Sequence, residues 1–408
     1  MTSPIELPSY RILGGVGFGI HRHARSRKGR GLFRKAPDPR EVGDRLGRLA
    51  RRMLRDAVIR SGAKGDGADY RYIVTLKLHP GAPPATMTVQ DTGEILLDAE
   101  TSSLGPGYHA HVMQRVSSIL DELDFVWSDE DDAAATGAAM CAWLADQLRG
   151  AGQVRIGIPA ARRFRIAAPV LTALGPRDAA WRDAVLADPS KGADAFPWWQ
   201  TGPGREELSR ALLALSLEVP WREPLDKTER ELMTEVDEDL RAARKADPAL
   251  PLPYPEWKEL LMHLGIEDED VNEKAGDRTS LLGYRRHDLE VELSGGWQIV
   301  LPGSLVGHWE DDGAKYWATD GDRAIEFSSL TATDELDSAK LLAVAPERYE
   351  VIERLVEDHR HGRAEAFDQD GTAIVIGLMC TAPHVGILTC KGGTRDWALA
   401  TWRSLQHG

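Results

Sequence analysis

Hydrophobic and polar residues repeat with two different periods in the first 170 residues. Between residues 70 and 78, and again between 86 and 99, apolar and polar side chains alternate one by one, which predicts β-strands. Between residues 40 and 60, and again from Tyr108 to Leu123, apolar residues recur every three or four positions, which predicts amphipathic helices. The strands and the second helix predict a sheet-and-helix module over residues 67–170.

The middle of the chain is predicted to be mainly helical. Residues 206–218, 226–245 and 256–264 each show the period of a helix, and proline or glycine follows the second and third of them. The polar stretch 267–277 lacks such a period and predicts a surface loop. Residues 171–277 therefore form a predicted helical middle region with few strands.

Short alternating runs return in the last part of the chain. We expect strands that include residues 315–318 and 373–380, and a helix from Pro346 to His359 with proline in its first turn. Thr394 is predicted to cap a closing helix, because its hydroxyl can accept a backbone N–H of the first turn. These elements predict a second sheet-and-helix module over residues 278–408.

The order of strands and helices in this second module is similar to that of a known fold. The run Gly296–Pro302 leads into a strand, and the run Ile325–Leu330 forms another. This order resembles the PsbP-like α/β fold over about residues 288–408. The resemblance implies a sheet with helices packed against it, and it implies no catalytic residues.

The predicted fold class is α+β: two α/β sheet-and-helix modules joined by a largely helical middle region. Residues 1–66 precede the modules as a basic arm with an amphipathic helix. Residues 21–35 show no hydrophobic period and predict a loop, and residues 62–67 (GAKGDG) predict a linker.

The composition is that of an ordinary soluble globular protein. Of the 408 residues, 42% are hydrophobic and 28% are charged, which suffices for two or three cores. The apolar run 12–20 is too short to span a bilayer and lacks the flanks of a signal peptide, so we expect neither a membrane span nor export. Cys141, Cys380 and Cys390 have no C-x-x-C spacing and predict free thiols in a reducing cytoplasm. A turn at 382–385 would place the last two out of register.

Basic residues are concentrated at the beginning of the chain. Residues 1–66 hold 16 Lys and Arg against 6 Asp and Glu, a balance of +10, whereas the rest holds 34 against 58, a balance of −24. Five arginines lie on the polar sides of the predicted helix: Arg45, Arg48, Arg51, Arg52 and Arg55. Such an arm either binds an anionic partner such as nucleic acid or docks on the acidic part of its own chain. We expect a solvated or self-docked face, because no aromatic residue lies among these arginines and the net charge of −14 repels polyanions.

A run of acidic residues follows the second helix. It contains seven carboxylates and no basic residue: Asp121, Glu122, Asp124, Asp129, Glu130, Asp131 and Asp132. Because these carboxylates repel one another, we expect the run to stay exposed and to meet a basic protein partner. The alternative is that the basic arm of the same molecule covers it.

His109 and His111 are the strongest candidates for metal ligands. Residues two apart on a regular helix point about 200° from each other, so both could bind one ion only in an irregular first turn. We expect His109 to point toward the apolar stripe of its helix and His111 away from it, and we predict no metal site. The other histidine pair, His359 and His361, is predicted to end a helix, where histidine cations are favourable.

An aromatic loop runs from Ala195 to Gly204 between glycine and proline residues. Its aromatic side chains, Phe196, Trp198 and Trp199, could line a binding cleft. Aromatic clusters under long loops more often fill a core, and we expect that arrangement here.

No G-x-S-x-G, H-E-x-x-H, P-loop or C-x-x-C motif occurs, and we predict no catalytic residue and no cofactor. The prediction is a non-enzymatic cytoplasmic protein-binding factor, bacterial by its arginine- and alanine-rich composition. A toxin-neutralising immunity protein or a defence-system accessory factor fits this prediction, because a carboxylate-rich surface steers a basic partner. The alternatives are a nucleic-acid-associated protein that uses the basic arm, and a metal-dependent enzyme centred on His109.

Overall fold

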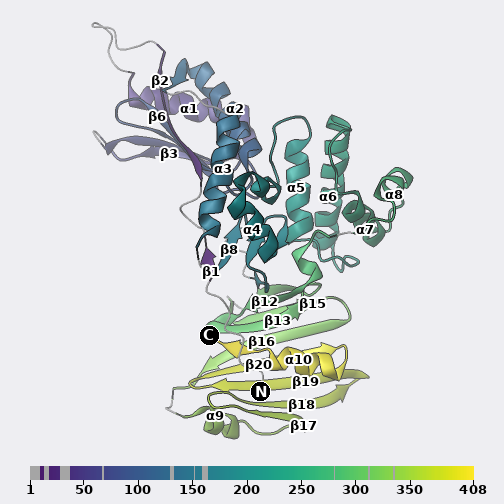
Figure 1. Cartoon of the computed structure of the whole chain (residues 1–408). Coiled ribbons are helices and arrows are strands. Elements are labelled where there is room, and N and C mark those ends of the chain that lie inside the picture. The colour runs from purple at the N-terminus through teal and green to yellow at the C-terminus, as the bar shows by residue number, and fades with distance from the viewer. Residues whose placement is uncertain are drawn as a thin grey trace. The chain divides into compact units, whose positions relative to one another are not determined.

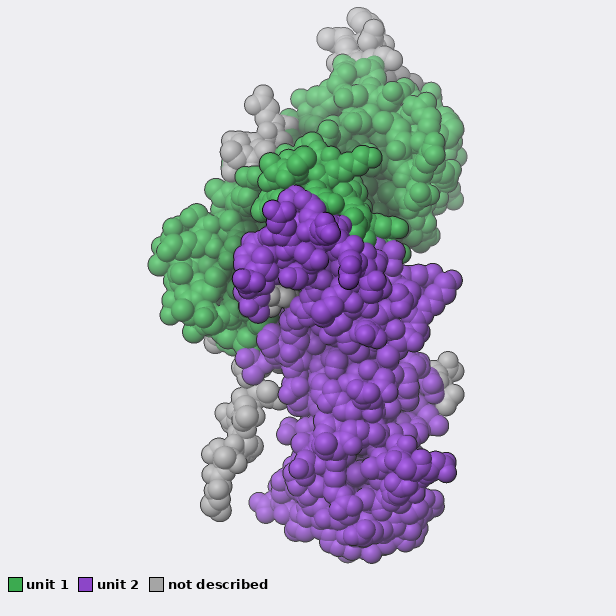
Figure 2. Space-filling model, turned by 90° about the vertical axis from the view of Figure 1, so that its right-hand side faces the viewer, with its two compact units in different colours: residues 1–161, 168–216, 235–253 green, residues 162–167, 217–234, 254–408 purple. Residues whose placement is uncertain are grey.

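The computed structural model confirms an α+β protein (Figure 1). It describes the following residues: 10–12, 18–27, 37–66, 69–128, 133–150, 152–158, 164–279, 281–310, 313–333 and 336–408. The chain divides into two units built from discontinuous segments, which Figure 2 shows in green and purple. Unit 1 comprises residues 1–161, 168–216 and 235–253, and unit 2 comprises residues 162–167, 217–234 and 254–408.

The main sheet of unit 1 has six antiparallel strands in the order β3-β4-β5-β6-β2-β7. The strands are β2 (Gly19–Ser26), β3 (Val58–Lys64), β4 (Arg71–Leu76), β5 (Ala85–Val89), β6 (Ile95–Glu100) and β7 (Phe125–Trp127). Along β4, β5 and β6 every second residue is buried, as the alternating sequence pattern predicts. The inward side chains pack beneath α1 (Pro39–Leu54) and α2 (Pro106–Leu123), whose apolar stripes are buried.

Two predictions for the basic arm are wrong. Residues 21–26 of the predicted loop 21–35 belong to strand β2, and residues 28–35 lie outside the described residues. Strand β3 extends to Lys64 into the predicted linker. The inward positions of β2 are Ile20, Arg22 and Ala24, so a charged residue interrupts the hydrophobic pattern. Arg22 is buried because its guanidinium lies 5.1 Å from the ring centre of Trp127. This favourable contact could not be read from the local sequence.

The rest of unit 1 is a smaller sheet with helices. Strands β1 (Tyr10–Ile12), β8 (Gln153–Ile156), β10 (Val170–Thr172) and β11 (Gly175–Arg177) pair in the order β1-β8-β10-β11. Around them lie α3 (Ala133–Leu148), α4 (Ala179–Ala187), the 3-10 segment η3 (Pro189–Ala195) and α5 (Arg205–Leu217). Their core includes Leu144, Val154, Val170 and Phe196.

The helices of the middle region are shared between the units. Helix α6 (Lys227–Ala246) begins in unit 2 and ends in unit 1, while α7 (Tyr254–Leu264) and α8 (Glu269–Ala275) belong to unit 2. The predicted loop at 267–277 is therefore wrong in part. Asp268 caps α8 by accepting the N–H of Val271 at 3.1 Å, and the helix buries Val271 and Ala275. Two inward residues are too few to show as a period in the sequence.

Unit 2 contains a seven-stranded antiparallel sheet in the order β14-β15-β16-β20-β19-β18-β17. Its strands are β14 (Val306–Glu310), β15 (Lys315–Thr319), β16 (Arg323–Thr331), β17 (Glu350–Val356), β18 (His361–Gln369), β19 (Thr372–Thr381) and β20 (His384–Gly392). A second sheet, β21-β13-β12-β9, pairs β21 (Gln406–His407), β13 (Trp297–Pro302), β12 (Asp288–Glu292) and β9 (Phe164–Arg165). Helix α10 (Arg395–Arg403) and the second sheet share one core with the seven-stranded sheet, around Trp297, Phe327 and Trp402. Helix α9 (Ser338–Val344) also packs on β18 and β19.

The predicted helix from Pro346 to His359 is wrong, because these residues contain strand β17. Val351, Ile352 and Val356 fit either period, but β-branched side chains favour a strand, and pairing with β18 decides between them. His361 accordingly starts β18 and does not end a helix. The Thr394 cap is confirmed, since its hydroxyl accepts the N–H of Trp397 at 3.2 Å.

The three cysteines are free and buried. Cys380 pairs with Val385 and Cys390 pairs with Val375, so the prediction that the two lie out of register is confirmed.

Candidate functional site

The two candidate metal ligands occupy different environments at the start of α2. His109 is buried, as predicted, and its Nδ1 lies 3.1 Å from the hydroxyl oxygen of Thr101. His111 stacks near the rings of Tyr108 and Trp198, with ring centres 6.4 and 4.9 Å away. Within the described residues, no three His, Cys, Asp or Glu side chains come together as a metal-ligand set.

A buried serine and histidine, which the sequence did not reveal, lie beside this cluster. Nε2 of His79 is 3.0 Å from Oγ of Ser209, and the backbone N–H of Gly81 donates to Nδ1 of His79 at 3.1 Å. Because Nδ1 accepts, Nε2 carries the hydrogen and donates it to Ser209, whose hydroxyl in turn donates to the carbonyl of Glu206 at 2.8 Å. A nucleophilic serine requires the opposite tautomer, in which Nε2 accepts the hydroxyl proton. The pair is therefore a satisfied structural contact.

The electrostatics of the cluster also favour neutral imidazoles. Burial, and then the nearby charges of Arg210 and His111, lower the pKa of His79 to about 3. Burial and the charge of Arg115 lower the pKa of His111 to about 4. Both rings are uncharged at neutral pH, where they serve as packing and hydrogen-bonding groups.

The aromatic loop fills cores, in agreement with the expectation. Phe196 belongs to the core of the smaller sheet in unit 1, and Trp199 packs against that core. Trp198 is buried over the start of α2, where a Cβ at Gly107 would lie 2.3 Å from its Cδ1 atom. The N–H of Gly107 donates to the carbonyl of Trp198 at 3.0 Å, which anchors the loop to the helix.

The described part of the acidic run is engaged by the basic arm of the same chain. Arg27 contacts Asp121 at 2.5 Å, Arg52 contacts the Glu122 carboxylate at 3.2 Å, and Arg45 donates to the Glu122 carbonyl at 2.5 Å. These contacts match the self-docking alternative for the beginning of the run. Asp124 follows α2 in the left-handed conformation. The remaining members, Asp129, Glu130, Asp131 and Asp132, lie outside the described residues.

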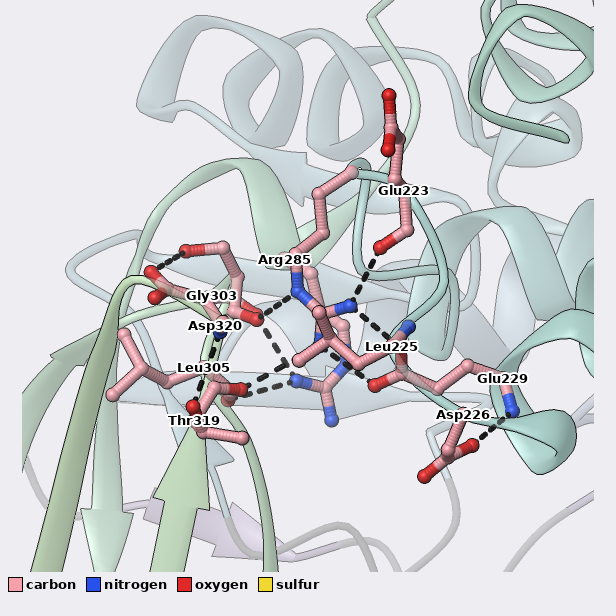
Figure 3. Close-up of polar contacts among 12 residues, drawn as sticks. Glu223, Leu225, Asp226, Glu229, Arg285, Gly303, Leu305, Thr319 and Asp320 are labelled. Atoms are coloured by element: carbon pink, nitrogen blue, oxygen red, sulfur yellow. Dashed lines mark hydrogen bonds and ion pairs between the residues drawn. The ribbon is translucent and has the colours of Figure 1, made fainter. Parts of the chain in front are cut away.

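Unit 2 contains a polar network that anchors the beginning of α6 (Figure 3). Arg222 and Glu229 form a two-pronged ion pair with N–O distances of 2.5 and 2.6 Å, and both side chains are largely buried. Nε of Arg222 donates to the carbonyl of Ser304 at 3.1 Å, and Asp226 caps α6 by accepting the N–H of Glu229 at 2.9 Å. The Arg222 guanidinium donates its hydrogen bonds to acceptors of the protein itself, and these bonds join the beginning of α6 to the turn before β14.

The seven-stranded sheet exposes part of the face opposite its core. We call this part the open face; it consists of His308, Lys315, Trp317, Glu326, Leu330, Ile387 and Thr389. The strand register places His308, Trp317, Glu326 and Thr389 in one row across β14, β15, β16 and β20. Lys315, Ser328 and Ile387 form the next row on the same face.

The open face ends where the segment before β17 covers the sheet. Over β18, Arg363 donates to the carbonyls of Ala345 and Pro346 at 3.0 Å, and Glu365 accepts the N–H of Arg348 at 2.9 Å. Over β14, β15, β16 and β20, by contrast, Trp317 and Ile387 are only half-buried, and Leu330 is 60% exposed. Trp309 on the edge strand β14 is 39% exposed.

No family model matches the chain, and no curated protein matches it. A crystal structure from Bacteroides thetaiotaomicron VPI-5482 is similar over 28% of this chain at 10% sequence identity and a TM-score of 0.22. This chain spans 45% of the length of that structure. The resemblance of residues 288–408 to the PsbP-like fold stays a prediction. Among the described segments, none of the helices has the length and apolar character needed to cross a membrane.

Proposed function

We propose that the protein is a non-enzymatic factor that binds another protein through the open face of unit 2. The observation that carries this proposal is the set of apolar side chains on the open face. Trp317 and Ile387 are half-buried, Leu330 is exposed, and the strand register places all three among polar residues. Exposed apolar surface rimmed by polar residues is typical of protein interfaces, and tryptophan is enriched among the residues that dominate binding energy. Here Trp317 lies beside His308, Lys315 and Glu326.

The edge of the sheet adds a second means of recognition. Strand β14 is the last strand of the sheet order, so only one of its sides pairs with a described strand. The unpaired backbone groups of an edge strand can accept a strand from a partner, with alternate side chains providing specificity.

The charge of this part of the chain favours a basic partner. Residues 254–408 hold 15 Lys and Arg against 29 Asp and Glu, a balance of −14, while residues 1–253 hold 35 of each. Acidic surface steers a basic protein by long-range attraction, which weakens as salt increases. A bacterial toxin is a partner of this kind, so we propose the role of a toxin-neutralising immunity protein or a defence-system accessory factor. The buried free thiols favour work in a reducing cytoplasm.

Photo-crosslinking can test this proposal in the protein's own cells. A crosslinking amino acid at position 308 identifies the partner that touches the open face, and titration with that purified partner then gives the affinity. We expect Trp317→Thr with Leu330→Thr to weaken binding at least tenfold, because two apolar anchors of the open face are removed while strand propensity is kept. Leu281→Ser is the matched control, since Leu281 is exposed in unit 2 but lies outside the open face.

Two results contradict the proposal. One is that position 308 captures no protein while positions outside the open face do. The other is that the Trp317/Leu330 variant, shown by circular dichroism to be folded, binds the partner as tightly as the unchanged protein.

A further inference from the structure

The exposed side of α1 in unit 1 presents an excess of positive charge that the fold does not neutralise. Residues 39–64, which include all of α1, contain eight Lys and Arg and three carboxylates, Glu41, Asp44 and Asp56. We call the exposed arginines between position 45 and the C-cap of α1 the arginine face: Arg45, Arg48, Arg51, Arg52 and Arg55. All five side chains belong to exposed residues.

Internal contacts satisfy three of these five arginines. Arg45 donates to the backbone carbonyl of Glu122, Arg52 contacts the Glu122 carboxylate, and Arg51 donates to the neutral hydroxyl of Ser61. Among the described residues, Glu122 is the carboxylate in contact with the arginine face, and it pairs with Arg52 alone. No hydrogen bond or ion pair joins the side chain of Arg48 or Arg55 to a described residue. The arginine face therefore has fewer counter-charges than charges.

The spacing along the helix makes these charges one continuous surface. Arg48, Arg52 and Arg55 are separated by four and three positions, which places them on one side of a helix. At 1.5 Å per residue, Arg48 and Arg55 are about 10 Å apart along the axis. A nucleic-acid duplex carries about one charge per 1.7 Å of its axis, so it presents several phosphates over that length.

The neighbours of the arginines distinguish nucleic acid from an acidic protein as the ligand. The apolar residues of α1, such as Val42, Leu46 and Leu49, face the sheet and are buried. The arginine face consequently offers no apolar anchor, whereas the centre of a protein interface is depleted of charge and rich in aromatic residues. Interfaces with nucleic acid are polar and strongly positive, and guanidinium groups bind phosphate with two parallel hydrogen bonds.

We infer that the arginine face binds the phosphate backbone of a nucleic-acid duplex without regard to sequence. Residues 254–408 account for all of the net charge of −14, whereas residues 1–253 hold 35 basic and 35 acidic residues. This inference is independent of the open face, which lies in unit 2 and would take a protein.

Fluorescence anisotropy with a labelled 20-base-pair DNA duplex of mixed sequence tests the inference on the full chain. We expect binding at 50 mM salt that weakens as salt increases. Log affinity falls with log salt, and each lost phosphate contact makes this fall less steep by about 0.9. Arg48→Ala with Arg55→Ala should therefore reduce the steepness by about 2. We expect the same variant to bind at least tenfold more weakly at 50 mM salt.

Two matched variants separate position from total charge. Arg230→Ala with Arg395→Ala removes two exposed arginines outside α1 and should leave duplex binding unchanged. Arg48→Lys with Arg55→Lys keeps the two charges and should retain the slope. The inference is overturned if the protein fails to bind the duplex at 50 mM salt, or if the Arg48/Arg55 alanine variant binds like the unchanged protein. It is also overturned if a polyglutamate of equal charge displaces the duplex as well as unlabelled duplex does, since the ligand would then be an acidic polypeptide.

Discussion

The two units pack a helix on a sheet in opposite ways. In unit 1 the large ring belongs to the sheet: Tyr72 of β4 lies under Gly43 and Gly47 of α1, and a Cβ at Gly43 would be 2.6 Å from the Tyr72 Cβ. In unit 2 the ring belongs to the helix: Trp402 of α10 lies over Gly362 and Gly377, and a Cβ at Gly377 would be 2.1 Å from Cδ1 of Trp402. Close approach of a ring requires glycine on the other element, whichever element that is.

The outward faces of the two main sheets differ as well. In unit 1 one row of the outer face contains Thr75, Thr86 and Asp98, and Asp98 is held by His21 at 2.5 Å. In unit 2 the corresponding side of the sheet carries Trp317 and Ile387. A hydroxyl-rich face is stable in water by itself, whereas half-exposed tryptophan gains free energy when a partner covers it. This difference is why we assign the protein partner to unit 2.

The largest expected effect on the free energy of unfolding comes from removing a buried ion pair of unit 2, in comparison with an exposed ion pair of unit 1. Glu229→Gln leaves the largely buried Arg222 guanidinium without a counter-charge, and we expect it to lower the free energy of unfolding of unit 2 by about 3 kcal/mol. Glu122→Gln in unit 1 removes an exposed partner of Arg52, and we expect less than about 1 kcal/mol. Urea unfolding with hydrogen exchange read separately in each unit measures both. If the two substitutions lower the free energy of unfolding equally, the prediction that the buried ion pair stabilises its unit more than the exposed pair is wrong.

Alanine at the packing glycines tests the opposite arrangement of ring and glycine. We expect Gly377→Ala and Gly43→Ala each to cost about 1–3 kcal/mol, because the added methyl group overlaps a buried side chain, Trp402 or Tyr72. For Gly43 the loss should appear although alanine is the better helix former by about 1 kcal/mol. Gly62→Ala is the control, since nothing lies within 4 Å of its Cβ position. A gain in stability at Gly43 would mean that Tyr72 can tilt away.

Acid should weaken unit 1 through its buried imidazoles. The pKa values of His79 and His111 are about 3 and about 4 in the folded chain, below the ordinary value of 6.5 in the unfolded chain. The unfolded chain therefore binds protons first, so the stabilisation is complete above pH 6.5 and is lost as the pH falls toward 4. The loss is at most about 1.4 kcal/mol per pH unit for each histidine.

Unfolding free energies at pH 7, 6 and 5 measure this slope. His79→Gln should remove the part of the pH dependence of the unfolding free energy that comes from His79. In unit 2 the pKa of His384 is also lowered, by desolvation and by the charge of His407, but this ring is only partly buried and its share should be smaller. A slope that His79→Gln leaves unchanged would assign the acid sensitivity to other groups.

The arginine face and the open face differ in how far the sequence revealed them. The five arginines lie within eleven residues of one helix, and the period of that helix places them without any tertiary information. The open face depends on residues from four strands, and its rows exist only because β14, β15, β16 and β20 pair in one register. A shift of one residue in a strand would turn its side chains to the core.

By itself the sequence determined the elements whose signals are local. The helices α2, α5 and α7, the hairpin of β5 and β6, and the cap at Thr394 follow from side-chain period and from hydrogen bonds that span three or four residues. Tertiary structure decided the rest. Strands β6 and β7 make β2 a strand by pairing with it, β18 does the same for β17, and Ser209 satisfies His79 from 130 positions away. Such contacts depend on which distant segments meet in the fold, and that is not encoded in any short stretch of sequence.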